Sequence, residues 1–191
     1  ISVALRRARK SEGARSPIQT YYDAVEAEVL LARGDEDLAL AMAERAADAL
    51  PKTEVLLRAR VLAVAAESAR RLGKYTTEAA RLEQVLRVDG GVLRRLRLSI
   101  PAQFKAEGSA LSKDASAAIE RSPRFRDDPG FVVRVTEVAP PGGGNKDGLR
   151  ACLLTGRNER IACAEVHRDE GKAGTPPADA KTSGKAITPG K

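Results

Sequence analysis

The sequence predicts an α+β protein in which α-helical hairpins are followed by a small β-α-β-β-β domain and a disordered tail. From residue 16 to residue 89, apolar side chains recur about every 3.6 positions, as in amphipathic helices. After Gly90-Gly91 the apolar and polar residues alternate instead, as in half-buried strands. We therefore divide the chain into four parts: a partial helix or linker at 1–15, a helical domain at 16–90, a small α/β domain at 93–167, and a tail at 168–191.

Composition narrows the class of protein. The 191 residues are 42% hydrophobic and 31% charged, which is typical of a globular chain. The net charge of +7 comes from 33 basic and 26 acidic residues that are mixed along most of the chain. Because aromatic residues make up only 3% of the chain, stacking platforms for nucleic acid are scarce, and no nucleic-acid partner is expected. No apolar run approaches the roughly 18 residues that a membrane span needs.

The first residue is Ile1 rather than Met. We therefore expect a preceding segment, which could be a signal peptide, a lipid-anchored stretch or further protein. A lipid-anchored segment, one of these alternatives, would place the chain near a membrane. We also expect the chain to be the tail of a longer protein or to pack on a partner, and its oligomeric state stays open.

The helical half contains four expected helices. Ser16-Pro17 provides a capping residue followed by a proline suited to the first helical position. Breaks follow at Gly34-Asp35, Pro51 and Gly73-Lys74. The expected helices are 18–33, 36–50, 54–72 and 76–88.

The first helix pair, 18–50, resembles a tetratricopeptide repeat. Relative to the turn glycine Gly34, the family expects a small residue seven places before, small residues five and twelve places after, and a proline seventeen after. The chain has Ala27, Ala39, Ala46 and Pro51 at those positions. Small residues are needed there because the two helices cross too closely for larger side chains.

The second pair repeats the pattern with departures, so that the resemblance covers residues 18–89. Ala66 lies seven places before Gly73 and Tyr75 two places after it, as in the family, whereas Ala79 lies one place beyond the expected small residue, Val85 replaces a small residue and Gly90 replaces the proline. The two turn glycines are 39 positions apart, compared with roughly 34 in the standard repeat. A plain four-helix bundle of alanine-rich helices is the alternative.

The tetratricopeptide resemblance implies a concave groove that holds a peptide or helix of another protein and carries no chemistry. The groove would be lined by the first helix of each pair. The candidate partner-binding residues are Tyr21, Glu28, Arg33, Arg58 and Glu67.

The second half begins with an expected strand. Leu96, Leu98 and Ile100 alternate with polar residues, and Pro101 indicates an edge strand or a bulge. Arg94, Arg95 and Arg97 form a local basic cluster, either a site for an anionic partner or membrane surface or the solvent face of this strand.

A helix, a strand and a hairpin are expected next. The helix begins at Gly108-Ser109, ends near Arg121, and carries an apolar stripe of Leu111, Ala115, Ala118 and Ile119. A strand rich in β-branched residues follows at 131–138. Strands at 149–155 and 160–166 are joined by a turn at 156–159.

The stretch AIERSPRFRDDPGFVV, within residues 93–167, resembles small periplasmic α/β domains of bacterial envelope proteins, such as the amino-terminal domain of the Tol translocation protein. There too a helix runs into a similar turn. This resemblance implies a role in envelope assembly and brings no catalytic residues.

Cys152 and Cys163 are placed symmetrically about the hairpin turn at Arg157-Asn158, so they should stand directly opposite each other. Facing residues are close enough for a disulfide after small adjustment, and a disulfide would indicate an oxidising compartment. Alternatively, both cysteines are buried, reduced residues in a cytosolic protein. Two sulfurs without further ligands do not form a zinc site, so no metal is expected.

Other candidate sites are weak. His167 is the only histidine and is expected at the surface. The glycines at 142–144 lead into a strand rather than a helix, so they do not form a phosphate loop. Asp127-Asp128 lacks the spacing of a calcium loop. With no nucleophile–base pair visible, the chain is not expected to be an enzyme or to use a cofactor.

The sequence thus predicts a non-catalytic interaction or scaffold protein, whose partner is another protein or a peptide, in a bacterial envelope complex. The alternative is a regulatory protein whose α/β module senses a small molecule. The expected location is the periplasm or cell envelope, or otherwise the cytoplasm.

Overall fold

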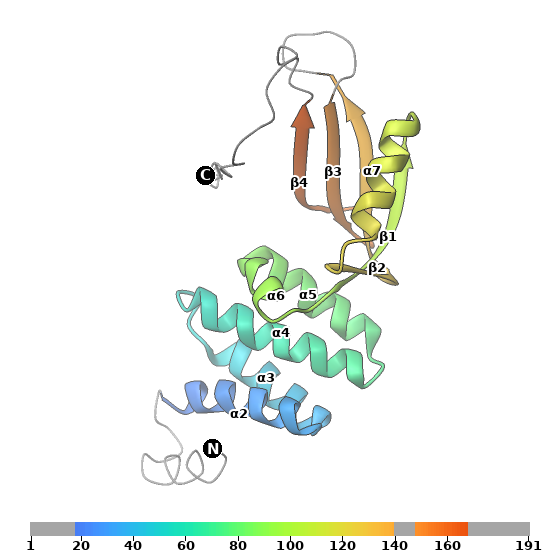
Figure 1. Cartoon of the computed structure of the whole chain (residues 1–191). Coiled ribbons are helices and arrows are strands. Elements are labelled where there is room, and N and C mark those ends of the chain that lie inside the picture. The colour runs from blue at the N-terminus through green and yellow to red at the C-terminus, as the bar shows by residue number, and fades with distance from the viewer. Residues whose placement is uncertain (1–17, 140–147, 168–191) are drawn as a thin grey trace, which may run out of the picture.

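The computed structural model describes residues 18–139 and 148–167 (Figure 1). The expectations for residues 1–15, for the glycines at 142–144 and for the tail at 168–191 lie outside these ranges. Within them, helices come first, and a four-stranded sheet with one helix follows. The α+β prediction is therefore confirmed.

Two helical hairpins occupy the first part of the structure. Their helices are α2 (Gln19–Arg33), α3 (Glu36–Ala49), α4 (Val55–Arg71) and α5 (Tyr75–Asp89), and a short helix α6 (Gly91–Arg95) follows. The turn glycines Gly34 and Gly73 have φ angles of 82° and 70°. This left-handed backbone ends a helix at little cost only in glycine, which explains why both positions carry it.

Alanine builds the core of the hairpins. α4 packs against α2, α3 and α5, and its central residues are buried on almost every side. The small residues singled out at helix crossings, Ala27, Ala39, Ala46 and Ala66, are all fully buried. Small side chains let the helix backbones approach closely, and dense packing of this kind leaves few voids.

The second part is a sheet in the order β1-β2-β3-β4. Its elements are β1 (Ile100–Glu107), α7 (Ala110–Glu120), β2 (Phe125–Val138), β3 (Gly148–Thr155) and β4 (Arg160–His167). β1 and β2 run parallel, and the other neighbours run antiparallel. This β-α-β-β-β order is the predicted one. α7 packs mainly on β1 and β2, as Figure 1 shows.

The first predicted strand is partly wrong. Leu96 and Leu98 lie before the strand, and their amides donate to the carbonyls of Val92 and Leu93, which continues the helical turns of α6. The strand begins only at Ile100. Local hydrogen bonding therefore overrides the alternating pattern.

The two alternatives offered for Pro101 both hold. β1 is an edge strand, and its register shifts between Pro101 and Ala102.

The basic cluster is not the solvent face of a strand. Arg94 and Arg95 lie in the last turn of α6, and Arg97 follows with a φ of 56°. Arg95 pairs with Asp89 at 2.5 Å. The three side chains are exposed on a helix end and the turn after it.

The apolar stripe expected on α7 is rotated in the structure. The helix buries Ser112 and Ser116, while Leu111 is 52% exposed and Ala118 is also exposed. The Ser112 hydroxyl donates to the Ser109 carbonyl at 2.9 Å, so it is satisfied inside the protein. Small side chains at the contact allow α7 to lie close to the sheet, which the hydrophobic pattern alone did not reveal.

α5 and the start of β2 join the two parts. The carboxylate of Glu78 on α5 is 3% exposed and pairs with the guanidinium of Arg126. Arg126 also donates to Asp128 at 2.7 Å and to the Ser99 carbonyl at 2.9 Å. A second pair, Arg87–Glu159 at 3.2 Å, is exposed on both sides.

Candidate functional site

The first helices of the two hairpins, α2 and α4, lie side by side and are connected by polar contacts along one face. The Tyr21 hydroxyl donates to Glu54 at 3.3 Å, near the N-terminal end of both helices. Arg60 donates to Glu28 at 2.6 Å in the middle. Near the C-terminal end, Arg71 donates to the Leu31 carbonyl at 3.3 Å. These contacts hold the two helices in a fixed relation.

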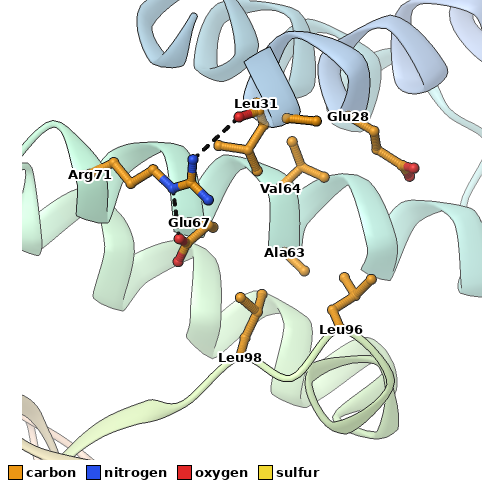
Figure 2. Close-up of a pocket in the computed structure, with 9 residues that line it drawn as sticks. Glu28, Leu31, Ala63, Val64, Glu67, Arg71, Leu96 and Leu98 are labelled. Atoms are coloured by element: carbon orange, nitrogen blue, oxygen red, sulfur yellow. Dashed lines mark hydrogen bonds and ion pairs between the residues drawn. The ribbon is translucent and has the colours of Figure 1, made fainter. Parts of the chain in front are cut away.

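A pocket of about 290 Å³ opens between these helices (Figure 2). α4 contributes its floor, α2 one wall, and the linker between α6 and β1 the other. Figure 2 shows Leu96 and Leu98 of that linker pointing toward Ala63 on α4. The lining residues are Glu28, Leu31, Ala32, Ala63, Val64, Glu67, Arg71, Leu96 and Leu98.

The same face carries apolar side chains outside the pocket. By helical spacing, Val25 lies beside Glu28 on α2, and Leu56 lies one turn before Arg60 on α4. Val25 is 44% exposed and Leu56 is 67% exposed. The Arg60–Glu28 pair thus lies between the pocket and a second apolar area. We call the face formed by Tyr21, Val25, Glu28 and Ala32 of α2 and by Leu56, Arg60, Ala63, Glu67 and Arg71 of α4 the α2–α4 face.

The charged residues at the pocket rim satisfy one another. Glu67 accepts hydrogen bonds from Arg70 at 2.6 Å and from Arg71 at 2.9 Å. Burial raises the pKa of Glu67, but these hydrogen bonds outweigh it and leave the pKa below its ordinary value. Glu28 is likewise held by Arg60. The rim is therefore polar but close to neutral, and the apolar floor is the part that offers binding energy.

The structure brings together some of the five predicted groove residues. Glu28 and Glu67 line the same pocket, and Tyr21 lies on the same face. Arg33 is exposed at the end of α2, and Arg58 is half-buried on α4; neither lines the pocket.

Leu96 and Leu98 were missed as pocket residues because their alternating pattern had assigned them to a strand.

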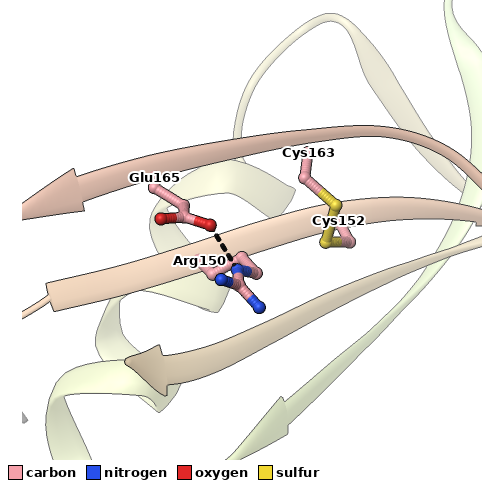
Figure 3. The surroundings of a disulfide bond; sticks show 4 residues. All are labelled: Arg150, Cys152, Cys163 and Glu165. Atoms are coloured by element: carbon pink, nitrogen blue, oxygen red, sulfur yellow. Dashed lines mark hydrogen bonds and ion pairs between the residues drawn. A yellow bond between two sulfur atoms is a disulfide. The ribbon is translucent and has the colours of Figure 1, made fainter. Parts of the chain in front are cut away.

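The two cysteines form a disulfide between β3 and β4 (Figure 3). Cys152 stands directly opposite Cys163, with 4.1 Å between the Cα atoms, as the hairpin symmetry predicted. Cys163 is exposed and Cys152 is half-buried, which does not fit the alternative of two buried thiols. Figure 3 shows the Arg150–Glu165 ion pair beside the disulfide. A disulfide is compatible with an oxidising compartment.

The described residues offer little for chemistry. No group of three or more His, Cys, Asp or Glu side chains within 18–139 and 148–167 could hold a metal ion. Asp128 is engaged by Arg126, and half-buried His167 lies 3.7 Å from Glu165. Across the same ranges, no helix has the length and apolar character that crossing a bilayer requires.

Comparisons of this chain with protein-family models, with curated proteins and with solved structures find no match.

Proposed function

We propose that this chain is a non-catalytic interaction protein that binds an apolar segment of another protein on the α2–α4 face. The observation that carries the proposal is the pocket of about 290 Å³ between α2 and α4, flanked on the same face by exposed Val25 and Leu56. Large apolar side chains gathered on one exposed face are typical of interaction surfaces.

The chemistry of the face indicates what kind of segment it would bind. One aliphatic side chain of the partner would enter the pocket and contact Leu31, Val64 and Leu98. A second apolar side chain would lie on Val25 and Leu56, on the other side of the Arg60–Glu28 pair. Because the rim charges already have partners, they would orient the segment more than attract it.

The resemblance of residues 18–89 to tetratricopeptide repeats supports this proposal. In that family the first helix of each hairpin lines the binding groove, and here α2 and α4 hold those positions. The disulfide and the resemblance of residues 93–167 to periplasmic α/β domains support a location in the periplasm or cell envelope.

The test is a peptide-display selection against the full chain, followed by binding measurements with two matched variants. Ala32→Arg places a long charged side chain in the pocket from an exposed position on α2. Ala41→Arg makes the same change at an exposed position on α3. We expect Ala32→Arg to weaken the selected peptides at least tenfold and Ala41→Arg to leave them unchanged.

The proposal fails if no selected peptide distinguishes the two variants. Selected peptides should also carry two aliphatic residues spaced to reach both the pocket and the Val25–Leu56 area. Circular dichroism of both variants checks that neither substitution has unfolded the helices.

A further inference from the structure

β4 is an edge strand of the sheet, and within residues 18–139 and 148–167 no further strand pairs with its outer side. The strand order leaves β1 and β4 at the two edges. β1 is interrupted by Pro101 and by the register shift beside it. β4 contains no proline, and its register shift lies at its beginning, opposite Leu153 and Leu154. A regular edge strand without such protection readily pairs with another strand.

The disulfide identifies which backbone groups of β4 are free. A Cα distance of 4.1 Å between Cys152 and Cys163 indicates a pair that does not exchange hydrogen bonds. The N–H and C=O of Cys163 therefore point away from β3, and by alternation those of Glu165 and His167 do so as well. The intervening Ala164 is bonded to Ala151 of β3.

One side of β4 is also apolar and exposed in the part of the chain that the structure describes. Ala162, Ala164 and Val166 pair with Leu153, Ala151 and Leu149, whose side chains lie on the face that carries α7. α7 packs mainly on β1 and β2 and, as far as the described residues go, leaves this part of the face open. All three β4 side chains are exposed, and Val166 is exposed by 70%. The edge and the apolar strip beside it form one continuous surface.

We propose that β4 pairs antiparallel with β4 of a second copy of this chain, with a two-fold axis at Ala164, to make an eight-stranded sheet. In this register Ala164 faces Ala164 of the second copy, and Val166 faces Ala162. The outward backbone groups of Cys163 meet those of Glu165. The apolar strips of the two copies join, and among the facing pairs within residues 161–167 no two like charges stand opposite each other.

The neighbouring registers that keep the apolar faces together are less favourable. An axis at Glu165 would set the two Glu165 carboxylates directly opposite each other, which is destabilising. An axis at Cys163 would set Val166 against charged Arg160. Small residues at the centre of β4 allow the two β4 strands to approach each other closely. A strand that is complementary to itself about a two-fold axis forms a closed dimer.

The first test is cysteine cross-linking in the full chain. With the axis at Ala164, an Ala164→Cys variant has facing cysteines in a non-hydrogen-bonded pair, about 4.5 Å apart at Cα, within disulfide reach. Residue 164 lies on the opposite face of the sheet from Cys152 and Cys163, so the native disulfide is not disturbed. We expect a covalent dimer on mild oxidation. The matched control, Ala162→Cys, faces Val166 and should stay uncross-linked.

The second test is sedimentation equilibrium of the full chain. Wild type should have twice the 20.3 kDa mass of the chain. Glu165→Pro removes an outward N–H without touching the bonds to β3, and edge strands tolerate proline. It should sediment as a monomer with unchanged circular dichroism, whereas Glu165→Gln should stay dimeric.

Three results would overturn the β4 pairing. One is a wild-type chain that is monomeric up to about 1 mM. Another is an Ala162→Cys variant that cross-links as readily as Ala164→Cys. That result would mean that the two β4 strands pair in another register or that the cross-link forms by random collision of two chains. The third is a Glu165→Pro variant that still dimerises, which would place the interface elsewhere. None of these results bears on peptide binding at the α2–α4 face.

Discussion

Replacing Arg126 with Met would leave the carboxylate of Glu78 buried without its counter-ion. Glu78 is 3% exposed on α5, and Arg126 is 21% exposed at the start of β2. The pair connects the helical part to the sheet. Met matches the length of the arginine stem but supplies no charge, so the variant isolates the loss of the guanidinium.

The expected loss of stability is about 3 kcal/mol. Removing one partner of a buried ion pair typically costs about 3–5 kcal/mol. The carboxylate of Glu78, once it has no counter-ion, can become neutral by taking up a proton. At pH 7, about 2.5 units above its ordinary pKa of 4.5, protonation costs about 3.4 kcal/mol at about 1.4 kcal/mol per unit. Protonation therefore limits the loss of stability to the lower end of the range of about 3–5 kcal/mol.

The assay is urea unfolding of the full chain at pH 7, followed by circular dichroism. Arg87→Met is the matched control, because the Arg87–Glu159 pair also connects α5 to the sheet but is exposed on both sides. That variant should lose at most about 1 kcal/mol. The double variant Glu78→Gln, Arg126→Met removes both charges and should recover much of the stability that Arg126→Met loses.

The pH dependence has a definite sign. Burial raises the pKa of Glu78 more than the hydrogen bond and charge of Arg126 lower it. A raised pKa in the folded state gives stability that is complete below the unfolded pKa and is lost as pH rises through the folded pKa. The unfolding free energy of wild type, relative to Glu78→Gln, should therefore fall as the pH rises above the ordinary carboxyl pKa of 4.5.

Two outcomes would refute the reasoning about this pair. Arg126→Met could unfold within 1 kcal/mol of wild type, which would mean that water reaches Glu78. The double variant could also be as unstable as the single one, in which case packing around Arg126, and not charge, would explain the loss.

Three further predictions concern single structural features. Replacing Cys152 and Cys163 with Ser opens a link between residues 11 apart and should cost about 2–3 kcal/mol; a reducing agent should lower the melting temperature of wild type but not of the variant. Ser109→Ala removes the side-chain cap of the Leu111 amide on α7 and should cost about 1 kcal/mol in urea unfolding, whereas Lys113→Ala should change little. Gly34→Ala forces a side chain into a backbone with φ of 82° and should cost about 1 kcal/mol; an unchanged melting temperature would contradict this.

Local signals in the sequence were enough to predict most of the helices and strands. Glycine and proline mark the ends of α2, α3 and α4, because few other residues can adopt or forbid the backbone required there. The β3–β4 hairpin and its facing cysteines followed from simple symmetry about the turn. These features depend on residues close together in the chain.

The candidate site was predicted only in part. The repeat pattern singled out Glu28 on α2 and Glu67 on α4, which line the same pocket. The wall formed by Leu96 and Leu98 could not be predicted, since it depends on a linker that folds back over α4 from a later point in the chain. The rotation of α7, which buries Ser112, likewise depends on how closely the helix approaches the sheet.

The sequence by itself determined the four helices of the hairpins, the β3–β4 hairpin and the facing positions of its two cysteines, because periodicity, turn residues and hairpin symmetry act over a few neighbouring positions. Only the tertiary structure decided which apolar residues stay exposed. Val25, Leu56 and Val166 follow the same patterns as buried residues, but no described element covers them. Burial is a property of what packs against a residue, and the partners that do so come from distant parts of the chain.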